Sequence, residues 1–146
     1  MAEPSSPIDH LDVRVRSLPS VEAFYDAVMP ELGLPRKTFA YVDPQGDWHD
    51  PDGAHPYNTI EYHATLVPGY AEAFIGFIEA AEMTVNPSRI ALRVATAQDV
   101  LRWADRLRQL GASNVELSED MDGYPAVFFN DPAGTYLELC ARKAKI

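Results

Sequence analysis

The stretch IDHLDVRV, residues 8–15, decides the fold, because the chain repeats it as SRIALRV at residues 88–94. His10 then matches Arg89, and the two copies are offset by 89 − 10 = 79 residues. Apolar and polar side chains alternate in both stretches, and this period of two predicts a strand with one apolar face. Two long copies indicate duplication of one supersecondary unit rather than a solenoid.

A helix is expected after each of these strands, because apolar residues recur there at helical spacing. They are Val21, Phe24, Tyr25 and Val28 in the first copy, and Val100, Trp103, Ala104 and Leu107 in the second. Ser17 or Ser20 is expected to cap the first helix and Thr96 the second, since a hydroxyl oxygen accepts from a free amide. Gly33 and Gly111 lie where a left-handed glycine would end each helix.

Three more strands are predicted after each helix, separated by turn signals such as EDMDGY and NDPAGT. In order, they cover 38–42, 59–66, 73–79, 114–117, 125–130 and 135–142. The element order is therefore βαβββ twice, which predicts an α+β fold in a single domain, 1–146, with modules at 8–79 and 88–142. Residues 80–88 link the modules, and the polar loop 43–58 of the first module is long enough to be functional or mobile.

The composition excludes several classes of function. A formal net charge of −10 would repel a phosphate backbone, so nucleic acid is not an expected partner. Cys140 is the single cysteine, which excludes an internal disulfide and a four-cysteine zinc site and is typical of a cytoplasmic location. The start, MAEPSSPIDH, does not resemble a secretory signal, and no apolar run approaches the roughly 20 residues that cross a membrane.

Four segments resemble the vicinal oxygen chelate superfamily, which includes glyoxalase I, bleomycin-resistance proteins, fosfomycin-resistance proteins and extradiol dioxygenases. The segments are IDHLDVRV, VEAFYDAVMPELGL, RIALRV and YPAVFFNDPAGTYLELCA, and the pattern DP-x-G-x-x-L-E-L in the last is the most specific. The resemblance covers nearly the whole chain. It implies the glyoxalase-like fold, in which two βαβββ modules curl their mixed sheets into a cup.

In metal-binding members of the superfamily, the ligands lie on the first and last strands of the modules. The resemblance implies His10 and Glu138 as catalytic residues and as ligands of a divalent metal such as zinc, nickel, manganese or iron. Arg89 replaces the usual second histidine, and the fourth ligand position falls at Gly76 or, with a shift that reverses the strand's faces, at Glu79. The ligand set is therefore incomplete, and a protein that uses no cofactor is the other expectation.

Arg89 cannot be a metal ligand, because a guanidinium group is always protonated. Three interpretations stay open: an ion pair with Glu138, a clamp on an anionic substrate, or a side chain turned to solvent. If the predicted strand faces are right, several polar side chains share the cup and are expected to bind substrate. They are Asp12, Arg14, Arg89, Arg93 and Tyr136. The resemblance favours Arg14 as a contact for an anionic group, while salt bridges at the rim are the alternative for Arg14 and Arg93.

The leading interpretation is a small-molecule enzyme with lyase or isomerase chemistry on a small, oxygenated, anionic substrate, in which His10 acts as an acid or base near neutral pH. Dioxygenase chemistry is less favoured, because the extradiol iron site that the resemblance implies has a histidine where Arg89 stands. The alternative is a non-catalytic protein of the bleomycin-resistance type, which sequesters a cationic drug in an acidic cleft. A homodimer is expected, and the apolar stretch AEAFIGFIEAA is the observation behind it.

The remaining conspicuous residues receive structural interpretations. His49 and His55, in HDPDGAH, are interpreted as part of a solvated loop, and His63 as a partly exposed structural residue. Cys140 is interpreted as a small buried hydrophobic residue. Trp48 and Tyr57 either form a lid over the cup or pack locally within their loop.

Overall fold

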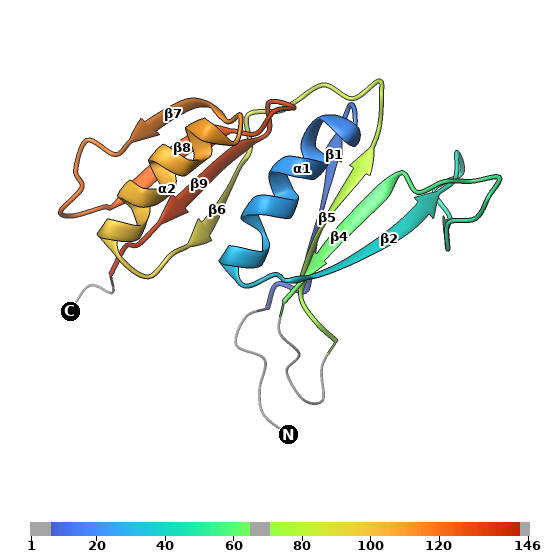
Figure 1. The fold of residues 1–146 in the computed structure, drawn as a ribbon, viewed down its shortest axis with the longest axis horizontal. Coiled ribbons are helices and arrows are strands. Elements are labelled where there is room, and N and C mark those ends of the chain that lie inside the picture. The colour runs from blue at the N-terminus through green and yellow to red at the C-terminus, as the bar shows by residue number, and fades with distance from the viewer. Residues whose placement is uncertain (1–6, 65–70, 144–146) are drawn as a thin grey trace. The chain divides into compact units, whose positions relative to one another are not determined.

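The computed structural model describes residues 7–64 and 71–143, and the chain divides into two compact units, 1–83 and 84–146. The first unit contains β1 (His10–Val15), α1 (Pro19–Val28), the 3₁₀ helix η1 (Pro30–Leu32), β2 (Arg36–Val42), β3 (Trp48–His49), β4 (Thr59–His63) and β5 (Phe74–Glu79). The second contains β6 (Arg89–Arg93), α2 (Ala97–Gln109), β7 (Ser113–Leu117), β8 (Ala126–Asn130) and β9 (Tyr136–Cys140). Each unit is one copy of the repeat (Figure 1).

The two sheets have the same topology. Strand order is β1-β5-β4-β2-β3 in the first unit and β6-β9-β8-β7 in the second. In each sheet the first strand pairs in parallel with the last, and the other neighbours pair antiparallel. The expected α+β class and the repeated βαβββ order are therefore confirmed, with the short strand β3 as an addition within loop 43–58. That the two units form a single domain stays a prediction.

The registers of the two parallel strand pairs decide which residues of the units are equivalent. The partners are His10–Phe74 and Asp12–Gly76 between β1 and β5, and Arg89–Tyr136 and Ala91–Glu138 between β6 and β9. His10 thus takes the place in the first unit that Arg89 takes in the second. Gly76 takes the place in the first unit that Glu138 takes in the second. The fourth ligand position of the family therefore falls at Gly76 and not at Glu79.

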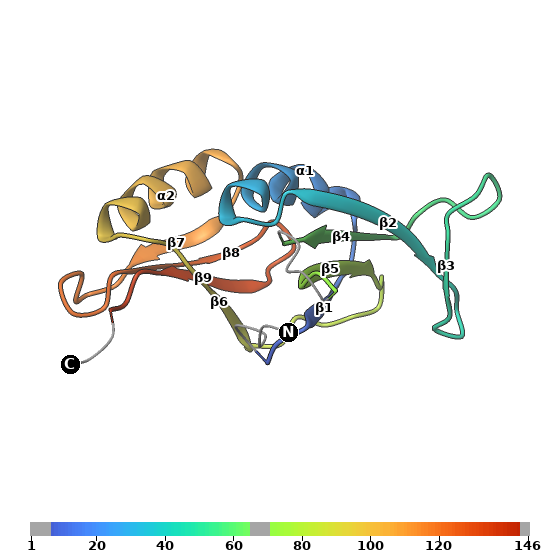
Figure 2. The same cartoon turned by 90° about the horizontal axis from the view of Figure 1, so that it is seen from below.

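A helix covers one face of each sheet (Figure 2). The helix residues that the apolar spacing predicts are all buried, namely Val21, Phe24, Tyr25, Val28, Val100, Trp103, Ala104 and Leu107. In the first unit, for example, the ring of Tyr25 stacks on Phe77 of β5 with the centroids 3.8 Å apart. Burial of one such side chain contributes about 1.5–3 kcal/mol, so each unit has an apolar core of its own between helix and sheet.

The two helices begin in different ways. Thr96 caps α2 as predicted, in a capping box that satisfies amides at both ends of the first turn. The predicted cap of α1 by Ser17 or Ser20 is wrong, because Leu18 is the N-cap and no side chain caps this helix. The physical reason is Pro19, which occupies the first helical position and brings no amide proton that would need an acceptor.

Gly33 and Gly111 have φ angles of 93° and 98°, so both predicted left-handed stops are confirmed. α1 itself ends at Val28, and η1 lies between it and Gly33. The six predicted strands are present, but 59–66 ends earlier, at His63, and its residues 65 and 66 lie outside the described part of the chain. Within the described ranges, none of the helices is long and apolar enough to cross a membrane.

Candidate functional site

The predicted site residues of each unit share the sheet face that the helix leaves open. Directly paired residues point to the same face of a sheet, and successive residues of a strand point to opposite faces. In the second unit, this places Arg89, Arg93, Tyr136 and Glu138 on one face, while Ile90 and its alternate neighbours face α2. In the first unit, the residues that share the open face are His10, Asp12 and Arg14.

Glu138 is a buried carboxylate on this face of the second unit. Only 6% of the residue is exposed, and its Oε2 accepts a hydrogen bond of 2.6 Å from the hydroxyl of Tyr124. The hydrogen bond to this carboxylate raises the pKa of Tyr124 to about 12, because it holds the phenol proton, and desolvation and the negative charge of Glu138 act in the same direction. Tyr124 therefore acts as a hydrogen-bond donor to Glu138 at neutral pH.

Arg89 stays on the same face as Glu138, but the two side chains do not form an ion pair. The guanidinium carbon of Arg89 lies 4.8 Å from the ring centroid of Phe128, which pairs with Glu138 across β8 and β9. Arg89 and Arg93 are both exposed, and in the described part of this unit neither forms a salt bridge. The first of the three interpretations of Arg89 is thus wrong, because the stack on Phe128 holds the guanidinium instead.

His10 lies on the open face of the first unit with its ring stacked on Phe74, 4.6 Å between centroids. Its Nδ1 is 2.7 Å from a carboxylate oxygen of Asp9, and its Nε2 is 3.7 Å from Asp12. The hydrogen bond to Asp9 raises the pKa of His10; desolvation opposes this increase, and the charges of Asp12, Asp9 and Glu61 add to it. His10 is therefore an exposed imidazole with its charged form favoured, suited to donate a proton or to bind an anion.

Two acidic side chains lie over Gly76 in the first unit. A Cβ atom at Gly76 would lie 3.2 Å from Oδ1 of Asp12 and 3.5 Å from Cγ of Glu61. Asp12 comes from β1 and Glu61 from β4, the two strands that flank β5. The glycine leaves space for both side chains, and the sequence offered no sign of this, because Glu61 and Asp12 lie far apart in the chain.

His63 is buried, with 9% of the residue exposed, so its interpretation as a partly exposed residue is wrong. Its Nε2 is 3.0 Å from the hydroxyl oxygen of Thr38 and 3.5 Å from Oε1 of Glu61. Its Nδ1 is buried without a hydrogen bond, 3.9 Å from Oε2 of Glu72. The error has a physical reason: β4 is a central strand whose residues are buried almost throughout, Glu61 being half-buried, so burial along it does not alternate.

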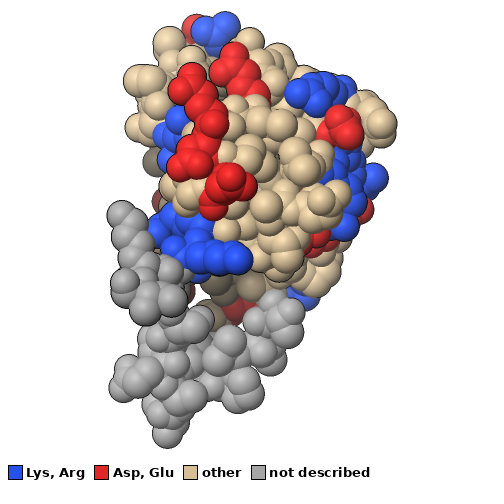
Figure 3. All heavy atoms as spheres, turned by 90° about the vertical axis from the view of Figure 1, so that its left-hand side faces the viewer, with Lys and Arg blue, Asp and Glu red and all other residues tan. Residues whose placement is uncertain are grey.

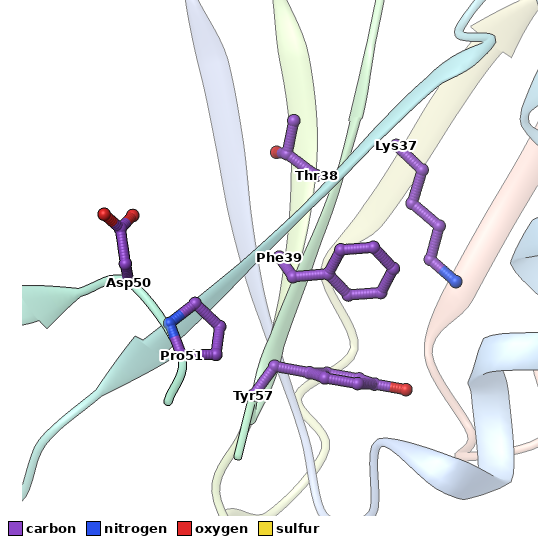
Figure 4. A pocket seen from close by; sticks show the side chains of 6 residues that line it. All are labelled: Lys37, Thr38, Phe39, Asp50, Pro51 and Tyr57. Carbon is purple, nitrogen blue, oxygen red and sulfur yellow. The ribbon is translucent and has the colours of Figure 1, made fainter. Parts of the chain in front are cut away.

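A separate hollow lies on the helix side of β2, away from the open face. Lys37, Phe39 and Tyr57 line this cavity of about 610 Å³, and Figure 4 shows the two rings side by side. The Lys37 ammonium is held by carboxylates of Glu22 and Asp26 at 2.7 and 2.9 Å. The Lys37 charge is therefore already paired, and Asp50, Pro51 and Tyr57 of loop 43–58 contribute part of the cavity wall.

Loop 43–58 also contains two histidines that pair with nearby carboxylates. Nε2 of His49 is 2.7 Å from Oδ2 of Asp43, and this hydrogen bond is the main reason that the pKa of Asp43 is lowered. His55 is 3.4 Å from Asp52 and stacks near Tyr41, with the ring centroids 4.8 Å apart. Both histidines are exposed and lie near the ring of Tyr41 on β2, in agreement with the interpretation of a solvated loop. Trp48 is exposed as well.

The comparison with known families follows this geometry. Residues 7–139 match the Glyoxalase/Bleomycin resistance protein/Dioxygenase superfamily. The chain belongs to this superfamily. The resemblance carried by the segments around the two repeats is therefore confirmed over nearly the whole chain. In sequence, no curated protein is a match.

Solved structures of superfamily proteins have the same fold. The fosfomycin resistance protein FosX of Listeria monocytogenes, in complex with Mn(II) and 1S,2S-dihydroxypropylphosphonic acid, is 16% identical, with 97% of this chain and 93% of that chain covered and a TM-score of 0.59. A glyoxalase/bleomycin resistance protein from Albidiferax ferrireducens is 17% identical, with 94% and 100% covered and a TM-score of 0.63. At such identities the likeness shows the fold alone, and the glyoxalase-like α+β fold of mixed sheets is confirmed.

Some superfamily proteins hold a divalent metal, as the Mn(II) complex of the Listeria protein illustrates. The residues of this chain do not fit such an ion within either unit as described. Among residues 7–64 and 71–143, no three His, Cys, Asp or Glu side chains are arranged to hold a metal. Arg89 brings a positive charge to the position of the second histidine, and Tyr124 occupies one oxygen of Glu138. No step of the function proposed below uses a metal.

The surface charges are distributed in patches. On the side drawn in Figure 3, acidic side chains form a stripe, and basic side chains form several groups separated by acidic and uncharged ones. The described surface on this side therefore offers no continuous basic track of the kind that follows a nucleic-acid backbone.

Four residues of the two open faces were not identified from the sequence as site residues: Glu61, His63, Tyr124 and Phe128. Phe128 could have been found, because it alternates with Asn130 and Ala126 on a predicted strand beside the one that carries Glu138. Tyr124 could not, because it follows a turn whose path is not set by any periodic pattern.

Proposed function

We propose that this superfamily member is a small-molecule enzyme that binds a small, oxygenated anion and moves a proton with Glu138, in lyase or isomerase chemistry. The observation that carries the proposal is the open face of the second unit. There, a buried carboxylate lies on the same face as Arg89 and Arg93, whose guanidinium groups form no salt bridge in the described part of the unit.

The arginines suit the anionic part of a substrate. A guanidinium group donates two parallel hydrogen bonds to a carboxylate, phosphonate or sulfate, and it keeps its charge at any physiological pH. The contact with Phe128 restricts Arg89 without using up its hydrogen-bond donors. Tyr136 is the register partner of Arg89 on β9, and the proposal gives its hydroxyl a contact with the same ligand.

Glu138 suits the proton transfer. A carboxylate that is shielded from bulk water keeps its basicity for a bound ligand, and a general base of this kind contributes roughly 10²–10⁴-fold to a rate. In this proposal, His10 is a second acid or base, Asp12 orients it, and Arg14 adds a positive charge on the open face of the first unit.

The phosphonate found in the Listeria protein supplies a first probe, because it combines an anionic group with neighbouring oxygens. Calorimetric titration with 1S,2S-dihydroxypropylphosphonic acid and, separately, with sulfate should show binding to the wild type. Arg89→Gln should weaken binding by about tenfold, or about 1.4 kcal/mol. Arg102→Gln is the matched control, since Arg102 is an exposed arginine paired with Asp99 on α2. Binding that is equal in all three proteins would overturn the assignment of Arg89.

Catalysis is tested separately from binding. Superfamily substrates that carry an anionic group are incubated with the protein and followed by NMR for the appearance of new signals. Glu138→Gln should leave binding within about threefold of the wild type and abolish conversion, because the amide cannot accept a proton from carbon. Conversion that survives in this variant would contradict the role of Glu138.

A non-catalytic, ligand-sequestering protein is the second candidate. The observation in its favour is the pair of carboxylates, Asp12 and Glu61, above Gly76 on the open face of the first unit. With a net charge of −10, such a face attracts a cationic drug rather than an anion. Tight binding of a bleomycin-type cation, unchanged on recovery and weakened in Asp12→Asn, would favour this candidate over the enzyme.

The assembly and location belong to the same proposal. The stretch behind the expected homodimer is largely buried in its own unit, since Ile75, Gly76, Phe77 and Ile78 of β5 are buried, so it supplies no surplus apolar surface. A homodimer is still proposed, because it would give the small units a larger common core, and sedimentation at micromolar concentration tests it. A cytoplasmic location is proposed from the free, buried Cys140, and cell fractionation tests it.

A further inference from the structure

Tyr124 is held in place by the turn that connects β7 to β8. The carboxylate of Asp120 accepts a hydrogen bond of 2.9 Å from the amide of Gly123, and the carbonyl of Asp120 accepts one of 2.7 Å from the amide of Tyr124. A Cβ atom on Gly123 would lie 2.2 Å from a carboxylate oxygen of Asp120, so a side chain at this position would displace that carboxylate from its hydrogen bond. The backbone thus fixes where the Tyr124 side chain starts.

The Tyr124 hydroxyl then reaches Glu138 across the sheet. Its hydrogen bond to Oε2 is short, 2.6 Å, as expected for a hydroxyl that donates to an ionised carboxylate. The other oxygen, Oε1, accepts no hydrogen bond from the described residues. It is also not among the described polar atoms that are fully buried without a hydrogen-bond partner. Tyr124 itself is 37% exposed and Glu138 only 6%, so the contact joins a buried carboxylate to a residue that reaches the surface.

We propose that Tyr124 is a positioning residue for Glu138, which holds Oε2 and leaves Oε1 as the one oxygen that meets a bound ligand. The inference rests on the proposed role of Glu138 as the proton acceptor. It adds that this carboxylate works through a single, fixed oxygen. Without the phenol, the carboxylate of Glu138 would be free to turn, and both of its oxygens would compete for the ligand and for water.

The chain provides a matched control in Tyr57. Its hydroxyl also donates to a carboxylate, Oε1 of Glu22 at 2.9 Å, and 40% of the residue is exposed, close to the value for Tyr124. Tyr57 lies in the first unit, at the cavity on the helix side of β2. Tyr57→Phe therefore removes the same chemical contact, a phenol hydrogen bond to a carboxylate, at a place where no role toward Glu138 exists.

The first measurement needs no ligand. Crystal structures of the wild type, Tyr124→Phe and Tyr57→Phe are compared at the carboxylate of Glu138. In Tyr124→Phe the carboxylate should rotate or occupy more than one conformer, whereas Tyr57→Phe should leave it in place. A carboxylate that keeps its single position in Tyr124→Phe would overturn the inference, whatever the protein binds.

The second measurement is a double-mutant cycle with 1S,2S-dihydroxypropylphosphonic acid as the probe, read by calorimetry together with the melting temperature. Tyr124→Phe alone should weaken binding by about twofold in a wild-type background, within the effect of Glu138→Gln itself, and have no further effect in a Glu138→Gln background. A merely structural role would lower affinity equally in both backgrounds, and that result would overturn the inference. If the wild type binds no probe, the proposed function fails, and the ligand-free crystal structures still decide whether Tyr124 positions Glu138.

Discussion

In the first unit, two acidic side chains from the flanking strands lie over Gly76, whereas in the second unit one carboxylate, Glu138, stands at the equivalent position between Ala91 and Phe128. The backbone registers of the two sheets are the same at this point. The acidic side chains, however, lie on different strands. In the first unit they lie on β1 and β4, the two neighbours of β5, and in the second unit the acid lies on β9 itself. One fold thus presents an acidic pair in one copy and a single buried acid beside arginines in the other.

This difference shows which part of a duplicated unit is constrained. The face toward the helix stays apolar in both copies, because burial of these side chains supplies most of the stabilisation of each unit. The open face makes no such contribution, and its residues are free to change chemistry without loss of the fold. The two units therefore keep a common core pattern and differ in charge where a ligand would bind.

The largest expected effect concerns the two cores. Phe24 and Trp103 are equivalent buried residues, 4% and 3% exposed, and replacing either by alanine should cost about 3–5 kcal/mol of the free energy of unfolding. If the units form the predicted single domain, both variants should lower the midpoint temperature of one common unfolding transition in calorimetry. Two transitions, of which each variant shifts only its own, would show that the units fold separately.

The second test places the acid of one unit into the other. Gly76→Glu adds a third carboxylate beside Asp12 and Glu61, and it should lower the free energy of unfolding by about 3 kcal/mol at pH 7, since like charges would be buried together. Gly76→Gln is similar in shape but uncharged. It should lower the free energy of unfolding by at least about 1 kcal/mol less than Gly76→Glu, since repulsion equivalent to one pKa unit corresponds to about 1.4 kcal/mol. Urea unfolding measures both. Equal stability of the two variants would show that charge does not distinguish the units here.

The third test concerns the equivalent positions of His10 and Arg89. It introduces at position 89 the histidine that metal-binding members of the superfamily have there. Arg89→His should raise the affinity for zinc, nickel or manganese by at least about tenfold, or about 1.4 kcal/mol, because an imidazole binds a metal where a guanidinium repels it. Arg93→His, on the same strand and face, is the control and should have a smaller effect. Tight stoichiometric metal binding by the wild type, or an unchanged metal affinity in a folded Arg89→His variant, would contradict this prediction.

The smallest effect at neutral pH concerns Tyr124. Glu138 raises its pKa to about 12, so the contribution of this contact to stability is complete below about pH 10, the ordinary pKa of tyrosine, and is lost as the pH rises toward 12. In Glu138→Gln the pKa of Tyr124 should fall toward the ordinary value. NMR titration of ¹³C-labelled tyrosine measures it, and Glu22→Gln is the control that should move Tyr57 instead. A Tyr124 pKa that is the same in wild type and Glu138→Gln would contradict the contact.

Much of the fold could be predicted because its signals are local or periodic. The alternation in residues 8–15 and 88–94 predicted the first strands, and the glycines at 33 and 111 predicted where the helical segments stop. The serine cap of α1 was predicted wrongly, because a proline at the first helical position and a serine nearby are both N-terminal signals, and the sequence does not say which one acts. The burial of His63 was missed because a central strand that is buried almost throughout loses its alternation.

The sequence by itself determined the duplication, the βαβββ order, the superfamily and the pairing of His10 with Arg89 as equivalent positions. Only the tertiary structure decided that Tyr124 holds Glu138 and that Asp12 and Glu61 both lie over Gly76. The reason is physical. A strand or a helix stop depends on a few neighbouring residues, whereas these contacts depend on sheet register and on the path of a turn, which bring together side chains that no periodic pattern of the chain connects.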